Sequence, residues 1–401
     1  MGPRDFDLVT SKEGKAFLKA YQHADPTQLV LNPPKKDFPN VSKNIRLFVD
    51  QLISQKKAIR KLPDWTDTPG IVYPPPLSIE QASSEETANY KKQLIGGKAL
   101  VDLTGGMGID CLALSERFEE CYYVERSTDL CAVFGHNAKL LGKAAIRIHN
   151  RDATGFLADW KKRDDTCFFF DPARRGANNN KVFQLTDCEP DATELVPEII
   201  KKGASVLIKT SPMLDIDLAL SELPCVKEVH LVAVKNELKE VLYWMSPEWE
   251  GAPKLVTVNL AERVQRFEFR KSEEAEATAT IGSVRHWLYE PNVSIMKAGA
   301  YKLIGQDFGV IKLDVNSHLY TSAQQVRGFP GRTFEVMGEL SKGNLDALIP
   351  AQKANIITRN YPLTPDQIKK KYKLKDGGDL FVIGTRSEGK PVLLLCRQVP
   401  C

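Results

Sequence analysis

Apolar and polar positions alternate in blocks through the middle of the chain. Short runs rich in β-branched and aromatic residues have the length of buried strands, and apolar residues at helical spacing follow most of them. Strands that alternate with helices predict a parallel sheet covered by helices, which is an α/β fold. Seven strands are expected, at 98–102, 121–124, 145–149, 166–170, 204–210, 226–234 and 254–260.

The two ends of the chain differ from this middle. The N-terminal residues show helical spacing of apolar groups without strand patterns, and they end in the proline-rich linker 73–76. The C-terminal residues mix strand candidates with a lysine-rich helix at 363–375, which Thr364 is expected to cap. We therefore predict a helical domain over 1–75, an α/β domain over 76–284 and an α+β module over 285–401.

A glycine-rich loop follows the first expected strand, where residues 102–110 read Asp-Leu-Thr-Gly-Gly-Met-Gly-Ile-Asp. Glycines at the start of a helix let a ligand approach backbone N–H groups. The dinucleotide-binding motif G-x-G-x-x-G would need glycine or alanine at its third glycine position, but Cys111 stands there. The carboxylates Asp102 and Asp110 suit instead a ligand with a cationic amino-acid head and ribose hydroxyls. A purely structural glycine turn and a nicotinamide or flavin site remain as alternatives.

Acidic residues also follow the next three strands. Glu125 lies 17 residues beyond Gly108, where α/β nucleotide sites place a carboxylate against ribose hydroxyls. Asp152 follows the third strand, and Asp171-Pro172 follows the aromatic fourth strand. Because the carboxyl ends of parallel strands share one edge of the sheet, we expect these groups to lie around the glycine loop.

The charge of the chain is unevenly distributed. Lys+Arg against Asp+Glu number 12 against 8 in residues 1–75, 26 against 33 in 76–284 and 17 against 10 in 285–401, so the parts carry +4, −7 and +7. Basic flanks around an acidic centre favour a polyanionic partner held outside the catalytic core, and ordinary solvated lysines remain as the alternative. Five lysines between 369 and 375, among them Lys370 and Lys371, form the strongest candidate patch.

Composition narrows the class of protein further. The eight cysteines form no C-x-x-C pair, which predicts reduced thiols, a cytoplasmic protein and no metal site. No apolar stretch approaches 18 residues, and the first residues show no signal-peptide core, so we expect no membrane segment.

Read together, these motifs resemble the bacterial class I S-adenosylmethionine (SAM)-dependent methyltransferases that carry a C-terminal THUMP-like domain. The specific parts are the D-P-A-R-R string after the fourth strand and the T-R-N-Y-P-L…K-Y-K-L-K-D-G-G-D tail. The resemblance covers residues 77–401, and the core is also similar to trimethylguanosine-synthase-type RNA methyltransferases. It implies a Rossmann-like seven-stranded core, SAM as cofactor, and tRNA or rRNA as the partner that receives the methyl group.

The resemblance also implies roles for particular residues. Asp171 and Pro172 would orient a base nitrogen or another nucleophile, although Ala173-Arg174 replace the proline and aromatic residue typical of base-amine methyltransferases. The segment 83–87 would cover the methionine end of SAM. The expected cofactor-binding residues are Asp102, Thr104, Gly105, Gly106, Gly108, Asp110, Glu125, Arg126, Asp152 and Ala153, and the expected substrate-binding residues are Arg174, Arg175, Ser84, Lys209, Lys370 and Lys371.

Three rival functions remain at this point. One is a methyltransferase that acts on a protein or a small molecule, which would be favoured if the basic C-terminal part had no role. A non-catalytic SAM- and RNA-binding protein would fit the missing aromatic residue after Asp171-Pro172. An NAD-dependent oxidoreductase would fit the glycine loop alone. The oligomeric state, the target nucleotide and the general base are not indicated by the sequence.

Overall fold

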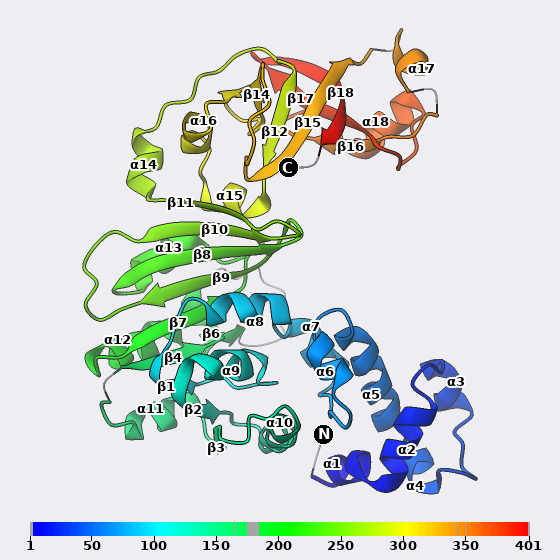
Figure 1. The fold of residues 1–401 in the computed structure, drawn as a ribbon, viewed down its shortest axis with the longest axis vertical. Coiled ribbons are helices and arrows are strands. Elements are labelled where there is room, and N and C mark those ends of the chain that lie inside the picture. Colours follow the sequence, from blue (N-terminus) through cyan, green and yellow to red (C-terminus); the bar gives the residue numbers. More distant parts are fainter. Residues whose placement is uncertain (1–2, 164, 175–183, 342, 350, 400–401) are drawn as a thin grey trace. The chain divides into compact units, whose positions relative to one another are not determined.

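The structure is a computed structural model that describes residues 3–163, 165–174, 184–341, 343–349 and 351–399 (Figure 1). By its residue contacts the chain divides into two compact units, Met1–Lys227 with Leu242–Gly251, and Glu228–Val241 with Ala252–Cys401. The division passes through the strands β8 (Val226–Val234) and β9 (Glu237–Met245). The three expected domains stay a prediction.

Short helices form the first part of the first unit. They are α1 (Pro3–Thr10), α2 (Lys12–Ala20), α3 (Pro26–Leu31), α4 (Pro39–Lys43), α5 (Ile45–Ala58), α6 (Pro63–Asp67), α7 (Pro76–Gln81) and α8 (Glu85–Lys92).

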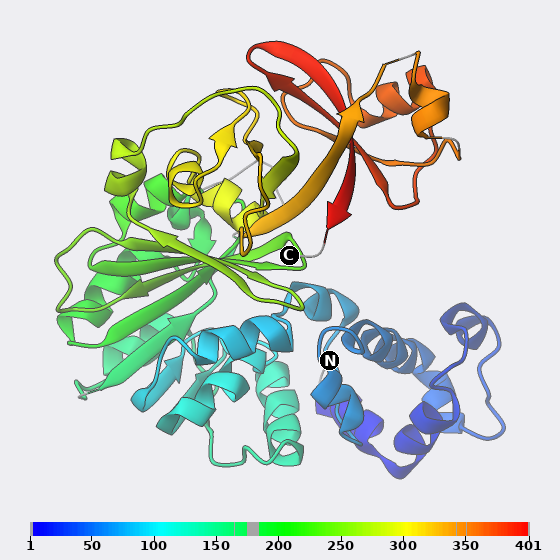
Figure 2. The same ribbon diagram turned by 45° about the horizontal axis from the view of Figure 1, so that its top comes forward.

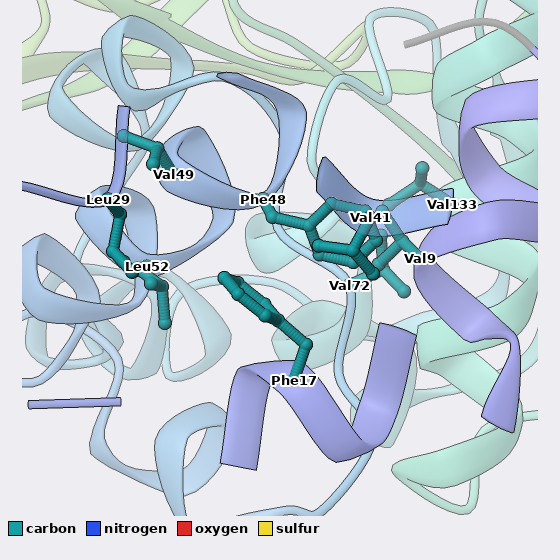
Figure 3. Close-up of a cluster of buried hydrophobic side chains, with 9 residues drawn as sticks. All are labelled: Val9, Phe17, Leu29, Val41, Phe48, Val49, Leu52, Val72 and Val133. Carbon is teal, nitrogen blue, oxygen red and sulfur yellow. The ribbon is translucent and has the colours of Figure 1, made fainter. Parts of the chain in front are cut away.

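The first five of these helices do not stand apart from the α/β core, because their buried side chains form one cluster with Val72 and with a residue of helix α10 (Thr128–Leu140). Figure 3 shows this cluster, in which aromatic and aliphatic side chains from separate segments of the chain converge. Its members are Val9, Phe17, Leu29, Val41, Phe48, Val49, Leu52, Val72 and Val133.

A parallel sheet forms the core of the first unit and confirms the expected α/β class. Its strands run in the order β7-β4-β1-β2-β3, and every pair among them is parallel. The interior strand β4 is buried along its whole length, and all of its residues after Thr166 are apolar, as expected for a strand buried on both faces. The strands are β1 (Gly97–Asp102), β2 (Phe118–Val124), β3 (Arg147–His149), β4 (Thr166–Phe170) and β7 (Ser205–Thr210).

Helices connect these strands, as the alternating pattern predicts. They are α9 (Ile109–Leu114), α10, α11 (Ala153–Asp159), α12 (Ala192–Lys201) and α13 (Ile216–Glu222), with short 3₁₀ turns at Ser115–Arg117 and Leu185–Asp187. A separate two-stranded sheet, β5 (Ala173–Arg174) with β6 (Cys188–Glu189), lies between β4 and α12 in the chain.

Strand β9 corrects the expected count of seven strands. Lys235 and Asn236 form a two-residue turn between β8 and β9. Both have positive φ angles, 49° and 63°, as two-residue hairpin turns require. Lys-Asn lacks the glycine that usually marks such a turn, so the sequence pattern did not indicate this strand. A further strand, β11 (Gln265–Phe269), pairs antiparallel with β10 (Lys254–Leu260), which is itself parallel to β8.

The rest of the second unit is an α+β module, as expected for the C-terminal part (Figure 2). Its sheet has the strand order β13-β14-β12-β15-β18-β17-β16, in which only the β16–β17 pair is parallel among the described strands. The strands are β12 (Trp287–Pro291), β13 (Ile311–Lys312), β14 (Tyr320–Ser322), β15 (Gly331–Glu339), β16 (Asn355–Thr358), β17 (Leu380–Ser387) and β18 (Lys390–Val399). The helices are α14 (Lys271–Glu276), α15 (Val293–Ala298), α16 (Leu303–Asp307), α17 (Leu345–Leu348) and α18 (Pro365–Tyr372).

None of the helices that the structure describes combines the length and the hydropathy needed to cross a membrane.

Candidate functional site

A cavity of about 690 Å³ lies in the first unit, beside the carboxyl ends of β1, β2, β4 and β7. This is the edge at which open parallel sheets bind ligands. The cavity brings together most of the site residues expected from the sequence. Those that line it are Asp102, Thr104, Gly105, Gly106, Gly108, Asp110, Glu125, Arg126, Asp152, Ala153, Asp171 and Lys209.

The glycine loop packs directly on two stacked aromatic rings, which explains why glycines are needed there. A Cβ atom on Gly105 would lie 2.2 Å from Cε2 of Tyr123, and one on Gly108 would lie 2.1 Å from Cδ2 of Phe134. The rings of Tyr123 and Phe134 are nearly parallel, with centroids 3.8 Å apart. The hydroxyl of Tyr123 also donates a hydrogen bond of 2.7 Å to the carbonyl of Gly106. The sequence analysis did not identify this aromatic support, because nothing in the spacing of the two rings links them to the loop.

Glu125 is held at the end of β2 by backbone groups. One carboxylate oxygen accepts the N–H of Gly106 at 3.0 Å, and the other accepts the N–H of Ser127 at 2.8 Å. Each carboxylate oxygen can accept a second hydrogen bond, so capacity remains for ligand hydroxyls. The expected carboxylate is therefore both placed on the cavity wall and fixed in orientation.

Hydrogen bonds join the ends of β1 and β4. Asp102 accepts the N–H of Thr104 at 3.0 Å, and the Thr104 hydroxyl accepts the N–H of Asp171 at 2.8 Å. Burial raises the pKa of the Asp102 carboxyl well above its usual range, and the nearby Asp110, Glu125 and Asp171 add to the shift. A cationic ligand would relieve this accumulation of carboxylates.

Ser83 is the centre of a buried network of charged groups. Its hydroxyl donates to Asp110 at 2.7 Å and accepts from the ammonium groups of Lys91 at 3.3 Å and Lys209 at 3.4 Å. Lys91 lies 3.2 Å from the other oxygen of Asp110, and Lys209 forms an ion pair with Asp171. Burial alone would raise the pKa of Asp110, but the charges of Lys91 and Lys209 outweigh that effect and lower it.

On the expected adenine and ribose side of the cavity, Arg126 and Asp152 are exposed, Glu125 is half-buried and Ala153 is buried. Asp152 caps α11 by accepting the N–H of Gly155 at 2.8 Å, and Ala153 begins that helix. Arg126 forms an ion pair of 2.7 Å with Glu189. The sequence analysis missed the acidic lining residues Glu189, Asp191 and Glu194, because they follow the fourth strand by about 20 residues and match no spacing rule.

The remaining expected residues lie elsewhere or are only partly described. Ser84 caps α8, where its hydroxyl accepts the N–H of Thr87, and the described lining includes its neighbour Ser83 instead. Pro172 is buried beside Asp171. Arg174 lies in β5 opposite Cys188, and Arg175 falls outside the described residues. Lys370 and Lys371 are exposed on α18 in the second unit.

The charges on the cavity wall indicate which kind of ligand the cavity suits. Among the described lining residues, eight carboxylates face three cationic side chains, Arg126, Arg151 and Lys209. A pyrophosphate would be repelled there, whereas a ligand with an ammonium and a sulfonium group is favoured. The same part of the chain that the structure describes contains no group of three or more His, Cys, Asp or Glu side chains arranged to hold a metal ion.

The chain is similar to known proteins both in its C-terminal part and over most or all of its length. Residues 287–330 match a family described as a ferredoxin-like domain, and residues 331–398 match one described as THUMP domain-like. The crystal structure of a putative methyltransferase from Porphyromonas gingivalis W83 superposes with a TM-score of 0.87 at 32% identity, and the match covers 100% of both chains. Uncharacterized S-adenosylmethionine-dependent methyltransferases from two Mycobacterium tuberculosis strains are 22% identical over 322 residues, which are 77% of this chain and 83% of theirs.

The fold, the acidic cavity and these relatives define a class I SAM-dependent methyltransferase. More narrowly, the chain belongs to the class I methyltransferases that carry a C-terminal THUMP-like domain. Its cofactor is SAM, and the NAD-dependent alternative is thereby set aside.

Proposed function

We propose that this enzyme methylates RNA, either tRNA or rRNA, by direct transfer of the methyl group to a base nitrogen or another nucleophile. The observation that carries the proposal is the THUMP domain-like match over residues 331–398, in which α18 exposes a run of lysines. Lys370, Lys371, Lys373 and Lys375 are exposed, while Lys369 is engaged by Asp366 and Asp376. Exposed lysines in the last turn of one short helix and just beyond it suit the phosphates of an RNA backbone.

Within the cavity we assign the two halves of SAM to different residues. Asp102, Thr104, the three glycines of the loop and Asp110 would surround the methionine half. Glu125 with Arg126 would hold the ribose, and Asp152 with Ala153 would contact the adenine. The carboxylates at the ends of β1 and β2 and at the start of α9 support this assignment, because they match the cationic and hydroxyl-bearing parts of the ligand.

SAM, when bound, supplies an electrophilic methyl group on a sulfonium. The task left to the chain is to align the acceptor and to take up a proton when one is released. Asp171 is suited to both, since the Thr104 hydroxyl fixes its backbone and its carboxylate pairs with Lys209. Burial raises the pKa of the Asp171 carboxyl, and the charge of Lys209 opposes that shift. We place Arg174 and Arg175, which follow Asp171-Pro172, on the RNA.

The test is transfer of a tritiated methyl group from SAM to total tRNA and to rRNA, with Asp171→Asn as the key variant. Loss of a positioned proton acceptor should lower the rate by roughly 10²–10⁴-fold and leave SAM affinity nearly unchanged. Asp217→Asn, an exposed change on α13, is the matched control and should behave as wild type.

Each outcome separates the candidates. Unchanged methylation by Asp171→Asn would remove Asp171 from the reaction. Incorporation into neither RNA class, together with binding of both SAM and RNA, would favour the non-catalytic alternative.

We also place the protein in the cytoplasm. Of its eight cysteines, the seven that the structure describes are all free thiols, as a reducing compartment would keep them. Mass spectrometry of the alkylated protein from cells would show labelled thiols throughout.

A further inference from the structure

The N-terminal helices reach the cofactor cavity through helix α7, which contributes Ser78 and Gln81, and through the short turn that follows it. Residues 82–84 connect α7 to α8, and Ser83 in this turn is 6% exposed. The Ser83 hydroxyl makes hydrogen bonds to all three of Asp110, Lys91 and Lys209. Anything that fixes this turn therefore fixes the wall beside Asp110.

Lys61 makes hydrogen bonds to the residues on both sides of the turn 82–84, at the end of α7 and at the start of α8. Its ammonium donates hydrogen bonds to the carbonyls of Ile79 at 2.9 Å and Glu80 at 2.7 Å, which are near the end of α7. Its own carbonyl accepts the N–H of Glu85, the first residue of α8, at 2.9 Å. The neighbouring Asp64 N–H donates to the Glu85 carboxylate at 2.9 Å.

The segment before α7 is anchored by helix α5. The side-chain amide of Gln51 accepts the N–H of Tyr73 at 2.9 Å and donates to its carbonyl at 2.5 Å. Ser54 donates to the carbonyl of Pro74 at 2.8 Å. Gln51 and Ser54 are buried, and α5, α6 and α7 lie side by side in both views (Figures 1 and 2).

The physical need for Lys61 follows from the length of α7. A helix of six residues has nearly all of its carbonyls near its C-terminal end, where no intrahelical N–H is available. A cation at that end satisfies these carbonyls and interacts favourably with the helix dipole. Without it, the end of α7 and the turn that carries Ser83 gain conformational freedom.

We propose that Lys61 is a positioning residue for the methionine half of SAM, and that the N-terminal helices serve as the support of the cofactor site. The inference rests on the proposed placement of that half beside Asp110. The N-terminal helices thereby have a role in cofactor binding rather than only in contact with a polyanion through their lysines. The lysines near the end of α5 are engaged by protein groups, Lys56 by the Ala24 carbonyl and Lys57 by Glu80.

The experiment compares Lys61→Met with Lys56→Met. Lys56 is an ideal match, because it lies on α5 and also donates to a backbone carbonyl, that of Ala24 at 2.9 Å, but it does not contact the turn. Binding of SAM and of 5′-methylthioadenosine, which lacks the amino-acid part, is measured by calorimetry on the full chain. Lys61→Met should weaken SAM binding about tenfold, or about 1.4 kcal/mol, and change methylthioadenosine binding less than about twofold.

Further variants separate positioning from general damage. Lys61→Arg keeps a cation and should restore SAM affinity to within about threefold of wild type. Thermal unfolding of each variant shows whether it is folded. Unchanged SAM affinity in Lys61→Met would overturn the inference, and so would an equal loss for both ligands. Wild-type protein that binds methylthioadenosine and SAM equally would instead refute the proposed placement of the methionine half.

Discussion

Replacing Glu125 with glutamine exchanges one carboxylate oxygen for an NH₂ group at nearly constant volume. In the wild-type protein both oxygens accept backbone hydrogen bonds, from Gly106 at 3.0 Å and from Ser127 at 2.8 Å. The NH₂ group of the variant must face one of these two N–H donors. The glycine loop or the start of α10 therefore loses a partner whichever way the amide turns.

The size of the effect follows from these contacts. A charge-assisted hydrogen bond to a ligand hydroxyl contributes roughly 1.5–3 kcal/mol, and the amide lacks both the charge and one acceptor. If one such bond is lost, the dissociation constant for SAM rises roughly 10- to 150-fold. The backbone N–H left without a partner adds a destabilisation of about 1–3 kcal/mol, which lowers the melting temperature.

Calorimetric titration with SAM, combined with thermal unfolding, measures both effects. Glu119→Gln is the matched control, because Glu119 lies on the same strand β2 but is exposed. It should leave affinity and melting temperature unchanged. A Glu125→Gln variant that binds SAM within twofold of wild type would refute the assignment of Glu125 to the ribose.

Two further predictions concern buried charge and RNA. Burial raises the pKa of the Asp102 carboxyl in the folded protein. The protonated carboxyl is therefore compatible with the fold at low pH, and stability is lost as the pH rises through the folded pKa. Asp102→Asn keeps the acceptor for Thr104, so it should melt above wild type at pH 8, by a margin that shrinks toward pH 4, and bind SAM more weakly. A margin independent of pH would contradict this. Lys370→Ala with Lys371→Ala should lower the slope of log K against log salt for RNA by roughly 1 per lysine, whereas Lys369→Ala, already ion-paired, should change it little.

Much of the candidate site could be predicted because many of the residues that line the cavity lie at strand ends. Asp102, Glu125 and Asp171 follow apolar runs directly, and parallel strands bring their carboxyl ends to one edge. The glycines are equally visible, since a loop between a strand and a helix needs backbone freedom there. These relations lie within about ten residues of each element, so one sequence suffices to recognise them.

Other parts of the site depend on contacts between distant residues. Ser83 reaches Asp110 across 27 positions, and Lys209 reaches Ser83 across 126. The sequence predicted that the segment 83–87, which includes Ser83, lies at the methionine end of SAM, and it named Ser84 as a substrate-binding residue. No spacing rule linked Ser83 to Asp110 or to Lys209. The Ser84 hydroxyl caps α8. Strand β9 was also missed, because its turn uses Lys235 and Asn236 in place of glycine.

The sequence by itself determined the α/β order, the glycine loop and the acidic strand ends, because hydrophobic periodicity and backbone freedom are local properties of the chain. Only the tertiary structure decided which groups complete the cavity. Packing brings remote segments of the chain into contact. It places the two aromatic rings against the glycines, the lysines around Ser83, and the Lys61 ammonium within hydrogen-bond distance of the carbonyls before the turn. Burial then sets the charge balance of those groups, and burial is a property of the folded chain.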